Sequence, residues 1–437
     1  MTDKTQTYSC PSLHHALYLG PDMLRHCCKR FFVDGELRGD AEIFPVKNDH
    51  DVDVSRIVQA KRDLYEAINR GEETQCSGCP FLVLDDWDPL DELRINFLSV
   101  ESHSVCNMRC SYCGPTYYGG LRPNYDLKSF LKRFVDSDAF AEDINIAWGG
   151  GEPTLTEDFE ETFELFAQKL QPKTNHLFTN AIKYSPVIAQ HLRDGTATVT
   201  ISTDAGTKET FTKVRGAKAF DKVFANIKKY HDIANRGVTI KYIFTGENSS
   251  LGEVNKFLEL IRKYKLNECD CQLSSNYKTE ELSDEQMHSV VHLYRELVKN
   301  GAKTCHIDDH LRPRFNKKLI EMTTARTFET KDFQFVGDKF SELKDEQFVI
   351  WGAGQLAYLM IRDSLLLAEK RIAFFVDKDE KKQGNLLCNI EVKSPEHIKN
   401  VDHPIIIASS RFYEEIYREL IGELGISENR IMGGLIV

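Results

Sequence analysis

Three closely spaced cysteines follow the first strand that the sequence predicts. They are Cys106, Cys110 and Cys113, in a C-x3-C-x2-C spacing shortly after the apolar, β-rich run of residues 95–100. Parallel α/β folds place their active sites at the carboxyl ends of strands. A cubane iron–sulfur cluster usually has four thiolate ligands, so three cysteines predict a cluster with one iron left open. The alternative is a zinc knuckle, which prefers four nitrogen or sulfur ligands.

Further motifs follow at the ends of successive predicted strands. Residues 148–153 read Trp-Gly-Gly-Gly-Glu-Pro, residues 178–181 Phe-Thr-Asn-Ala, and residues 202–206 Ser-Thr-Asp-Ala-Gly, before an Arg-Gly pair at 215–216. The glycines alone would indicate only a tight turn from strand to helix. Together with the cysteines and Tyr112, these segments resemble the ordered motifs of the radical S-adenosylmethionine (SAM) superfamily. That order favours the cluster over zinc.

The resemblance implies a cofactor set and a chemistry. It implies a [4Fe–4S] cluster on the three cysteines, with an open iron that chelates SAM, and reduction that yields a 5′-deoxyadenosyl radical. The electron would come from a low-potential donor such as flavodoxin or ferredoxin. The sequence names no catalytic acid, base or hydrogen donor. The positions that match SAM-binding motifs are Tyr112, Gly150, Gly151, Glu152, Asn180, Ser202, Asp204 and Arg215.

A second set of cysteines precedes this region. Cys10, Cys28, Cys76 and Cys79 supply four thiols, with Cys27 as the alternative to Cys28. Four ligands suffice for one closed cluster or one zinc ion. Their order resembles the SPASM/twitch auxiliary modules of radical SAM enzymes, so we expect a second [4Fe–4S] cluster. Zinc and plain buried cysteines remain the alternatives.

A rival cysteine pair lies on the sixth predicted strand. Cys269 and Cys271 are two residues apart, so both point to one face of that strand, and Cys305 is a candidate third ligand. Small core residues are the simpler interpretation of the pair.

A glycine-rich turn opens the C-terminal region. Residues 352–357 read Gly-Ala-Gly-Gln-Leu-Ala after the apolar strand 348–351, and a second strand ends at Asp377. Glycines let phosphate approach the backbone, and an acid after the second strand can bind a ribose hydroxyl. The pattern resembles small Rossmann-like domains appended to sugar-modifying enzymes. Gly352, Gly354 and Asp377 are therefore candidate nucleotide contacts, and a pure docking role stays open.

The elements that must position these residues alternate along the chain. Alternating strands and helices imply parallel βα units, here a partial (β/α)6 TIM-type barrel within an α/β fold. We expect an iron–sulfur module over 1–90, the barrel over 91–300, a connector over 301–345 and a Rossmann-like doubly wound domain over 346–437. The strands are predicted at 95–100, 144–148, 176–179, 198–202, 238–244 and 269–273, and the helices at 54–70, 127–135, 159–170 and 220–235.

Composition narrows the class of protein. The 437 residues are 28% charged, with a formal net charge of −11, which argues against general nucleic-acid binding. No stretch reaches the ~20 apolar residues of a membrane span, and the N-terminus has no secretory pattern. The cysteines are clustered, as in metal or redox sites, so we expect reduced thiols in the cytoplasm.

The sequence is consistent with three functions. The C-terminal region favours a radical SAM oxidoreductase, or a related radical enzyme, that acts on a carbohydrate or nucleotide-linked substrate. The auxiliary module suggests a radical SAM peptide or protein maturase. The third is a non-catalytic iron–sulfur sensor, for which a SAM-binding shell would be superfluous.

Overall fold

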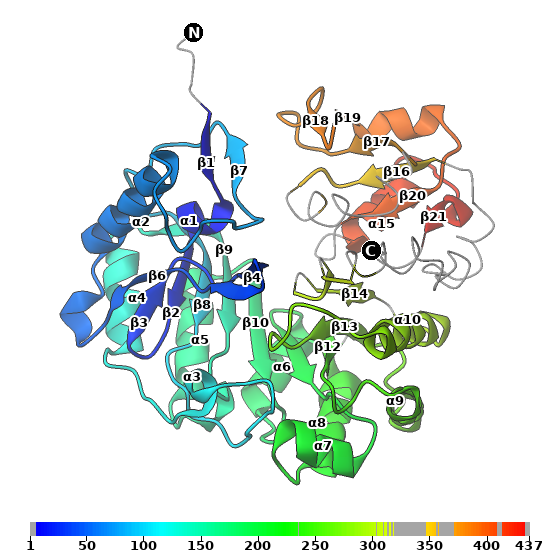
Figure 1. Cartoon of the computed structure of the whole chain (residues 1–437), viewed down its shortest axis with the longest axis horizontal. Helices are drawn as coiled ribbons and strands as arrows, with labels where there is room; N and C mark the ends of the chain where they lie inside the picture. The colour runs from blue at the N-terminus through cyan, green and yellow to red at the C-terminus, as the bar shows by residue number, and fades with distance from the viewer. Residues whose placement is uncertain are drawn as a thin grey trace. The chain divides into compact units, whose positions relative to one another are not determined.

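The computed structural model divides into two compact units. One comprises residues 1–203 and 208–239, and the other comprises residues 204–207 and 240–437 (Figure 1). The structure describes residues 6–234, 236–302, 304–308, 310–312, 314, 315, 318, 347–354, 357, 371–408 and 413–432. Most of the expected connector at 301–345 lies outside the described residues.

The first unit is built on a sheet whose strands lie in the order β11-β10-β9-β8-β2-β3-β6. Strands β8 to β11 and β2 run parallel, and β3 and β6 are antiparallel additions at one edge. The four strands expected at 95–100, 144–148, 176–179 and 198–202 are confirmed. The bounds are β2 (Ala16–Leu19), β3 (Met23–Arg25), β6 (Glu42–Pro45), β8 (Ile95–Val100), β9 (Phe140–Trp148), β10 (Thr174–Thr179) and β11 (Thr198–Ser202).

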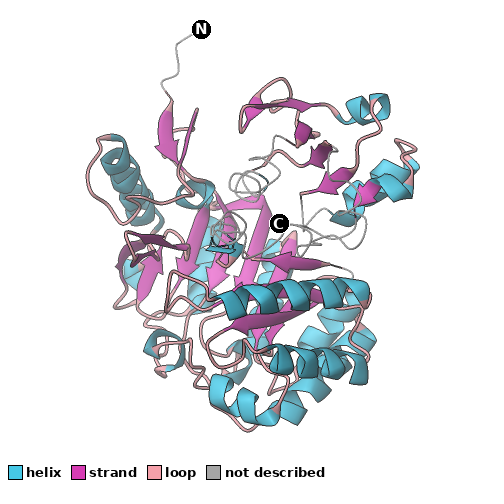
Figure 2. Ribbon diagram, turned by 45° about the vertical axis from the view of Figure 1, so that its right-hand side comes forward, coloured by secondary structure: helices cyan, strands magenta, loops and turns pink. Residues whose placement is uncertain are grey.

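Helices connect the parallel strands of this unit (Figure 2). Their starts follow local sequence signals: the Asp126 side chain accepts from the Ser129 N–H, and Ser185 caps the helix that begins with Pro186. The bounds are α3 (Pro115–Tyr118), α4 (Leu127–Asp136), η2 (Pro153–Leu155), α5 (Phe159–Leu170), α6 (Pro186–Asp194), α7 (Lys208–Arg215) and α8 (Phe220–Ile233). Helices α4, α5 and α8 agree with the predicted ranges to within two residues.

The N-terminal segment does not stand apart from the sheet. Strand β2 pairs in parallel with β8, so residues 16–19 extend the sheet that carries the cysteine loop. The expected module boundary at residue 90 stays a prediction. The remaining elements here are β1 (Thr7–Ser9), α1 (Pro11–His15), β4 (Arg30–Val33), β5 (Glu36–Gly39), η1 (Asp49–Asp51), α2 (Val54–Asn69) and β7 (Val83–Asp85).

The second unit begins with strands β12, β13 and β14, which are neighbours in that order, and helices α9 and α10 pack against each other. Strands β12 and β13 were predicted, and β14 was not. The buried Glu253 of α9 accepts hydrogen bonds from the backbone N–H groups of Gly206 and Thr207, at 2.6 and 2.9 Å. The bounds are β12 (Val238–Phe244), α9 (Leu251–Lys263), β13 (Asp270–Ser275), α10 (Asp284–Lys299) and β14 (Cys305–Ile307).

A separate sheet of this unit holds the C-terminal region. Its strands lie in the order β18-β19-β17-β16-β20-β21, and every pair except β18–β19 is parallel. Val349, Trp351 and Ile405 are among the fully buried residues of its core. The bounds are β16 (Phe348–Trp351), β17 (Ile372–Val376), β18 (Leu386–Leu387), β19 (Ile390–Lys393), η4 (Pro395–Asn400), β20 (Ile405–Ile407), α15 (Tyr413–Gly422), η5 (Glu428–Arg430) and β21 (Ile431–Met432).

Within the described ranges, no helix is both long enough and apolar enough to cross a membrane.

An aromatic cluster joins α5 to β9, just before the glycine motif. The Phe163 ring lies 5.3 Å from the Trp148 ring and 5.8 Å from the Phe159 ring, and Phe163 is completely buried. We predict that Phe163→Ala lowers the free energy of unfolding by about 3–5 kcal/mol, because a buried ring is lost and a cavity remains. Urea denaturation measures this change. The control Val135→Ala, on an exposed side chain, should change it by about 0.5 kcal/mol or less.

Candidate active site at the cysteine loop

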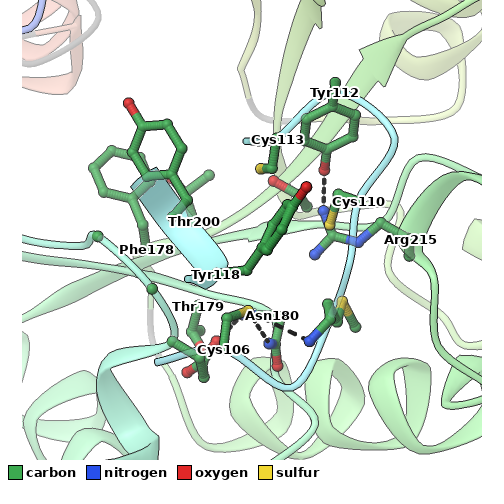
Figure 3. A pocket seen from close by; sticks show the side chains of 16 residues that line it. Cys106, Cys110, Tyr112, Cys113, Tyr118, Phe178, Thr179, Asn180, Thr200 and Arg215 are labelled. Atoms are coloured by element: carbon green, nitrogen blue, oxygen red, sulfur yellow. Dashed lines mark hydrogen bonds between the residues drawn. The ribbon is translucent and has the colours of Figure 1, made fainter. Parts of the chain in front are cut away.

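One open cavity of about 150 Å³ collects most of the residues that the motifs identified. Figure 3 shows the three cysteines, Tyr112, Asn180 and Arg215 around it. The cavity lies within the first unit, beyond the carboxyl ends of β8, β9, β10 and β11. Its lining is Cys106, Met108, Cys110, Tyr112, Cys113, Tyr117, Tyr118, Gly150, Gly151, Glu152, Phe178, Thr179, Asn180, Thr200, Ser202 and Arg215.

Of the three cysteines in the loop, Cys110 is buried and Cys106 and Cys113 are half-buried. A hydrogen bond with Cys110, followed by burial, raises the pKa of Cys113 well above that of a free thiol. Burial also raises the pKa of Cys106. These thiols therefore hold their protons at neutral pH unless a bound cation displaces them.

The thiol arrangement suits a cluster better than a single ion. Across the described parts of the chain, no three Cys, His, Asp or Glu side chains gather around a position for one metal ion. Each thiolate of a cubane binds a different iron, so the ligands of a cluster need not converge on one point. Cys106, Cys110 and Cys113 meet this looser requirement, since all three line the same cavity.

Backbone hydrogen bonds hold the cysteine loop from one side. Gly151 N–H donates to His103 O at 2.9 Å, and Glu152 N–H donates to Val105 O at 2.7 Å. A Cβ atom at Gly151 would overlap the Val105 carbonyl oxygen, and one at Gly150 would lie 2.7 Å from His103 O. The glycines thus let the motif after β9 pack directly against the segment that leads into Cys106.

A second element holds the same loop from the other side. Ser111 N–H donates to Val214 O at 2.7 Å, and Arg109 N–H donates to Arg215 O at 3.2 Å, both at the end of α7. The buried Arg215 guanidinium also hydrogen-bonds the Tyr112 hydroxyl. The loop is therefore fixed between the glycine motif and α7.

Glu152 places a buried carboxylate at the cavity. Its Oε1 accepts from the hydroxyls of Thr154 and Thr179 at 2.6 and 2.7 Å, and its Oε2 accepts from the Asn180 N–H at 2.6 Å. Burial raises the pKa of Glu152, whereas these hydrogen bonds oppose the rise. A cationic ligand in the cavity would further stabilise the ionised carboxylate.

Asn180 connects the third motif to the cysteine loop. Its Nδ2 donates to Asn107 Oδ1 at 2.7 Å. The same Nδ2 approaches Cys106 Sγ at 3.9 Å (Figure 3). On β11 the cavity is lined by Thr200 as well as Ser202. Thr200 was not predicted, although its spacing of two residues from Ser202 places both on one face of the strand.

Asp204 does not line this cavity. It belongs to the second unit, has a positive φ of 57°, and its Oδ1 accepts from the Ile243 N–H at 2.7 Å. Its contact with a cofactor stays a prediction.

The N-terminal cysteines lie in the first unit. Burial, and then the thiols of Cys27, Cys79 and Cys10, raise the pKa of Cys76 to about 12. The pKa of Cys28 is also raised to about 12, first by burial and then by Glu101.

The rival cysteines lie in the core of the second unit. Cys271 is in register with Cys305 on the neighbouring strand, and these residues and Cys269 are at most 2% exposed.

The C-terminal candidates lie together at the ends of β16 and β17. Gly352 N–H donates to Val376 O at 2.7 Å, and Asp377 Oδ2 accepts from Ala353 N–H and Lys382 Nζ, each at 2.9 Å. A Cβ atom at Gly354 would lie 3.9 Å from Lys382 Nζ, with no closer neighbour. The loop at Gly354 is thus open and has a cation beside it. Gln355 and Leu356 of the motif lie outside the described residues.

Comparisons with known proteins match these two regions separately. Residues 100–267 match the family described as "Radical SAM superfamily", and residues 344–432 match "C2185-like, N-terminal". A probable GTP 3',8-cyclase of Saccharolobus islandicus (strain Y.N.15.51 / Yellowstone #2) is 32% identical over 185 residues, covering 41% of this chain and 56% of that protein. The GTP 3',8-cyclase of Pasteurella multocida (strain Pm70) is 26% identical over 183 residues, covering 40% and 53%.

The chain spans about half the length of these curated relatives. Among solved structures, "Native anSMEcpe with bound AdoMet" is similar at a TM-score of 0.38 and 21% identity, over 53% of this chain and 66% of that one. Residues 100–267, which contain the cysteine loop, Glu152, Asn180 and Arg215, thus match the radical SAM superfamily, a family that implies a [4Fe–4S] cluster and SAM.

Proposed function

We propose that this chain is an enzyme that cleaves SAM reductively and abstracts hydrogen from a carbohydrate or nucleotide-linked substrate. The observation that carries the proposal is the joint position of three cysteines, Glu152 and Arg215 on one cavity. When bound, the [4Fe–4S] cluster and SAM supply a 5′-deoxyadenosyl radical. The protein supplies orientation and shields the reaction from water.

The chain's own residues have distinct roles in this proposal. Cys106, Cys110 and Cys113 would bind three irons as thiolates. Glu152, buried and oriented by three hydrogen bonds, would accept hydrogen bonds from the ammonium group of SAM. The Arg215 guanidinium, which hydrogen-bonds Tyr112, would pair with the carboxylate of SAM.

Two observations support a nucleotide-linked substrate. The curated relatives are named as cyclases of GTP, a nucleotide. The parallel strands β19-β17-β16-β20-β21 also have the order of a Rossmann-like sheet, with the Gly352–Gly354 turn directly after its central strand β16. Lys382 beside this turn offers a cation for a phosphate group.

Asp377 has a different role in this proposal from a simple ribose ligand. Its carboxylate already accepts hydrogen bonds from the glycine turn, Lys382 and Asp379 N–H. It would therefore fix the turn and hold Lys382 toward the phosphate. We also propose that the N-terminal cysteines bind an auxiliary [4Fe–4S] cluster.

The first prediction concerns the cluster. Cys110→Ala should abolish SAM cleavage, because a cubane held by two thiolates is not retained. Formation of 5′-deoxyadenosine by anaerobically reconstituted, reduced protein measures this loss. Cys388→Ala, outside both cysteine groups, is the matched control and should cleave SAM at the wild-type rate. If the wild-type chain forms no 5′-deoxyadenosine, the proposed enzymatic activity is refuted.

The second prediction concerns Glu152. Glu152→Gln keeps the size of the side chain but removes the charge that would face the ammonium group. We expect SAM to bind about 10–100-fold more weakly, the equivalent of one lost charge-assisted hydrogen bond. Equilibrium dialysis with SAM measures the affinity. Iron content should stay at the wild-type value, and unchanged SAM affinity would contradict the assigned role.

The third prediction concerns the C-terminal turn. Gly354→Val should weaken binding of GTP, used as the probe, at least about tenfold, because the side chain would block phosphate from the backbone. Gly354 has open space around it, so the fold should tolerate valine. Isothermal titration measures binding, with Gly422→Ala as the control. Equal GTP affinity in both variants would favour a docking role for this domain.

A further inference from the structure

The N-terminal segment brings four cysteines and one buried lysine together. We propose that the auxiliary iron–sulfur site is formed by Cys10, Cys27, Cys76 and Cys79, that Lys61 is its buried counter-charge, and that Cys28 is not a ligand. This inference rests on the auxiliary cluster of the proposed function and specifies its ligands and its electrostatic partner.

A strand pair and a cation–ring contact bring three segments of the N-terminal region together. Strand β1 pairs with β7 in a register that sets Ser9 opposite Val83, so Cys10 lies beside the chain that follows Cys79. Cys79 N–H donates to Cys76 O at 3.0 Å, which folds these two cysteines into one turn. Lys29 Nζ lies 4.7 Å from the centre of the Phe81 ring, which fixes the segment after Cys27 against the same turn.

The two adjacent cysteines face different surroundings. The thiol of Cys28 hydrogen-bonds the hydroxyl of Tyr18, a buried residue of β2, and is influenced by the carboxyl group of Glu101. Negative charge on the thiol of Cys27 raises the pKa not only of Cys28 but, unlike that of Cys28, also of Cys10, Cys76 and Cys79. Cys27 therefore completes a group of four thiols that Cys28 does not join.

Lys61 is a buried cationic side chain in the same region. Its side chain on α2 is 1% exposed, and its Nζ donates to the carbonyls of Leu13 and Ala16, each at 2.8 Å. Among the described residues, no carboxylate pairs with it. A buried ammonium group without a counter-charge is costly, by several kcal/mol.

The neighbouring thiols can supply that missing charge. Burial lowers the pKa of Lys61 to about 7, and negative charge on Cys10 and Cys27 opposes this shift. Ligation to iron makes both side chains thiolates. Four thiolates around a cluster carry a net negative charge, so the occupied site and the buried ammonium group stabilise each other.

The ligand test uses the full-length chain with Cys106, Cys110 and Cys113 all changed to alanine, reconstituted without oxygen. We expect it to retain about four irons and four sulfides per chain, which then belong to the auxiliary site. Adding Cys27→Ala together with Cys76→Ala leaves two of the proposed ligands and should remove this iron. Adding Cys28→Ala together with Cys76→Ala leaves three and should keep it in place. The inference would be overturned if the variant with Cys28→Ala loses the iron while the variant with Cys27→Ala keeps it. Zinc in place of iron in the triple variant, or no bound iron, would also overturn it.

Two controls separate folding from ligation and this inference from the proposed function. Cys27→Ala in the otherwise unchanged chain should keep about four irons on the first cluster. Loss of all iron there would mean that the variant does not fold, and Cys76→Ala together with Cys79→Ala would then provide the ligand test. If the wild-type chain fails to cleave SAM while the triple variant still holds iron, the proposed function fails and the auxiliary site stands.

The charge test uses Lys61→Met and Lys61→Arg in the same triple variant. Both should retain the iron. Lys61→Met should shift the reduction potential of the remaining cluster to a more negative value, because a nearby positive charge favours the reduced form. Lys61→Arg should keep the potential close to that of the parent. An unchanged potential in Lys61→Met would overturn the role of Lys61.

Discussion

The candidate site depends on direct backbone pairing between two loops. Residues 149–152, after β9, hydrogen-bond to residues 103–105, which lead from β8 into the cysteine loop. This pairing requires glycine, because a Cβ atom at Gly151 would overlap the Val105 carbonyl. The same short segment ends in Glu152. One close approach of two backbones therefore sets the position of both the thiols and the carboxylate.

Burial of the Glu152 side chain makes its ionised form costly in free energy. A carboxylate away from water is unfavourable, and three hydrogen bonds from Thr154, Thr179 and Asn180 offset part of that cost. Those donors lie on two successive strand-end segments, so the carboxylate also connects β9 to β10. Their hydrogen bonds occupy both carboxylate oxygens and fix the orientation in which a ligand's ammonium group would meet the carboxylate.

The sequence predicted the parts of the fold that local patterns control. Strand β8, with its apolar run, and helix α4, with its Asp126 cap, follow from periodicity and capping, whereas β14 has only three residues and little pattern. The placement of Cys10 beside the chain that follows Cys79 depends on the pairing of β1 with β7, which no local pattern encodes. Thr200 could have been found from its alternation with Ser202, because both face the cavity.

The two cysteine groups share an electrostatic feature that neither motif reveals. Arg215, 4% exposed, lies on the cavity of Cys106, Cys110 and Cys113, and Lys61 lies beside Cys10 and Cys27. A buried cation beside thiols favours their ionised form, which is the form that binds iron. The contrast lies in their partners: Arg215 faces an open cavity, where an anionic group of a ligand can also pair with it. Lys61 is enclosed, and among the described residues its Nζ donates to the carbonyls of Leu13 and Ala16. In the proposed auxiliary site its compensating charge comes from the protein's own thiolates. This difference favours binding of an anionic ligand group at the first site. At the second site it favours a charge that is balanced within the protein.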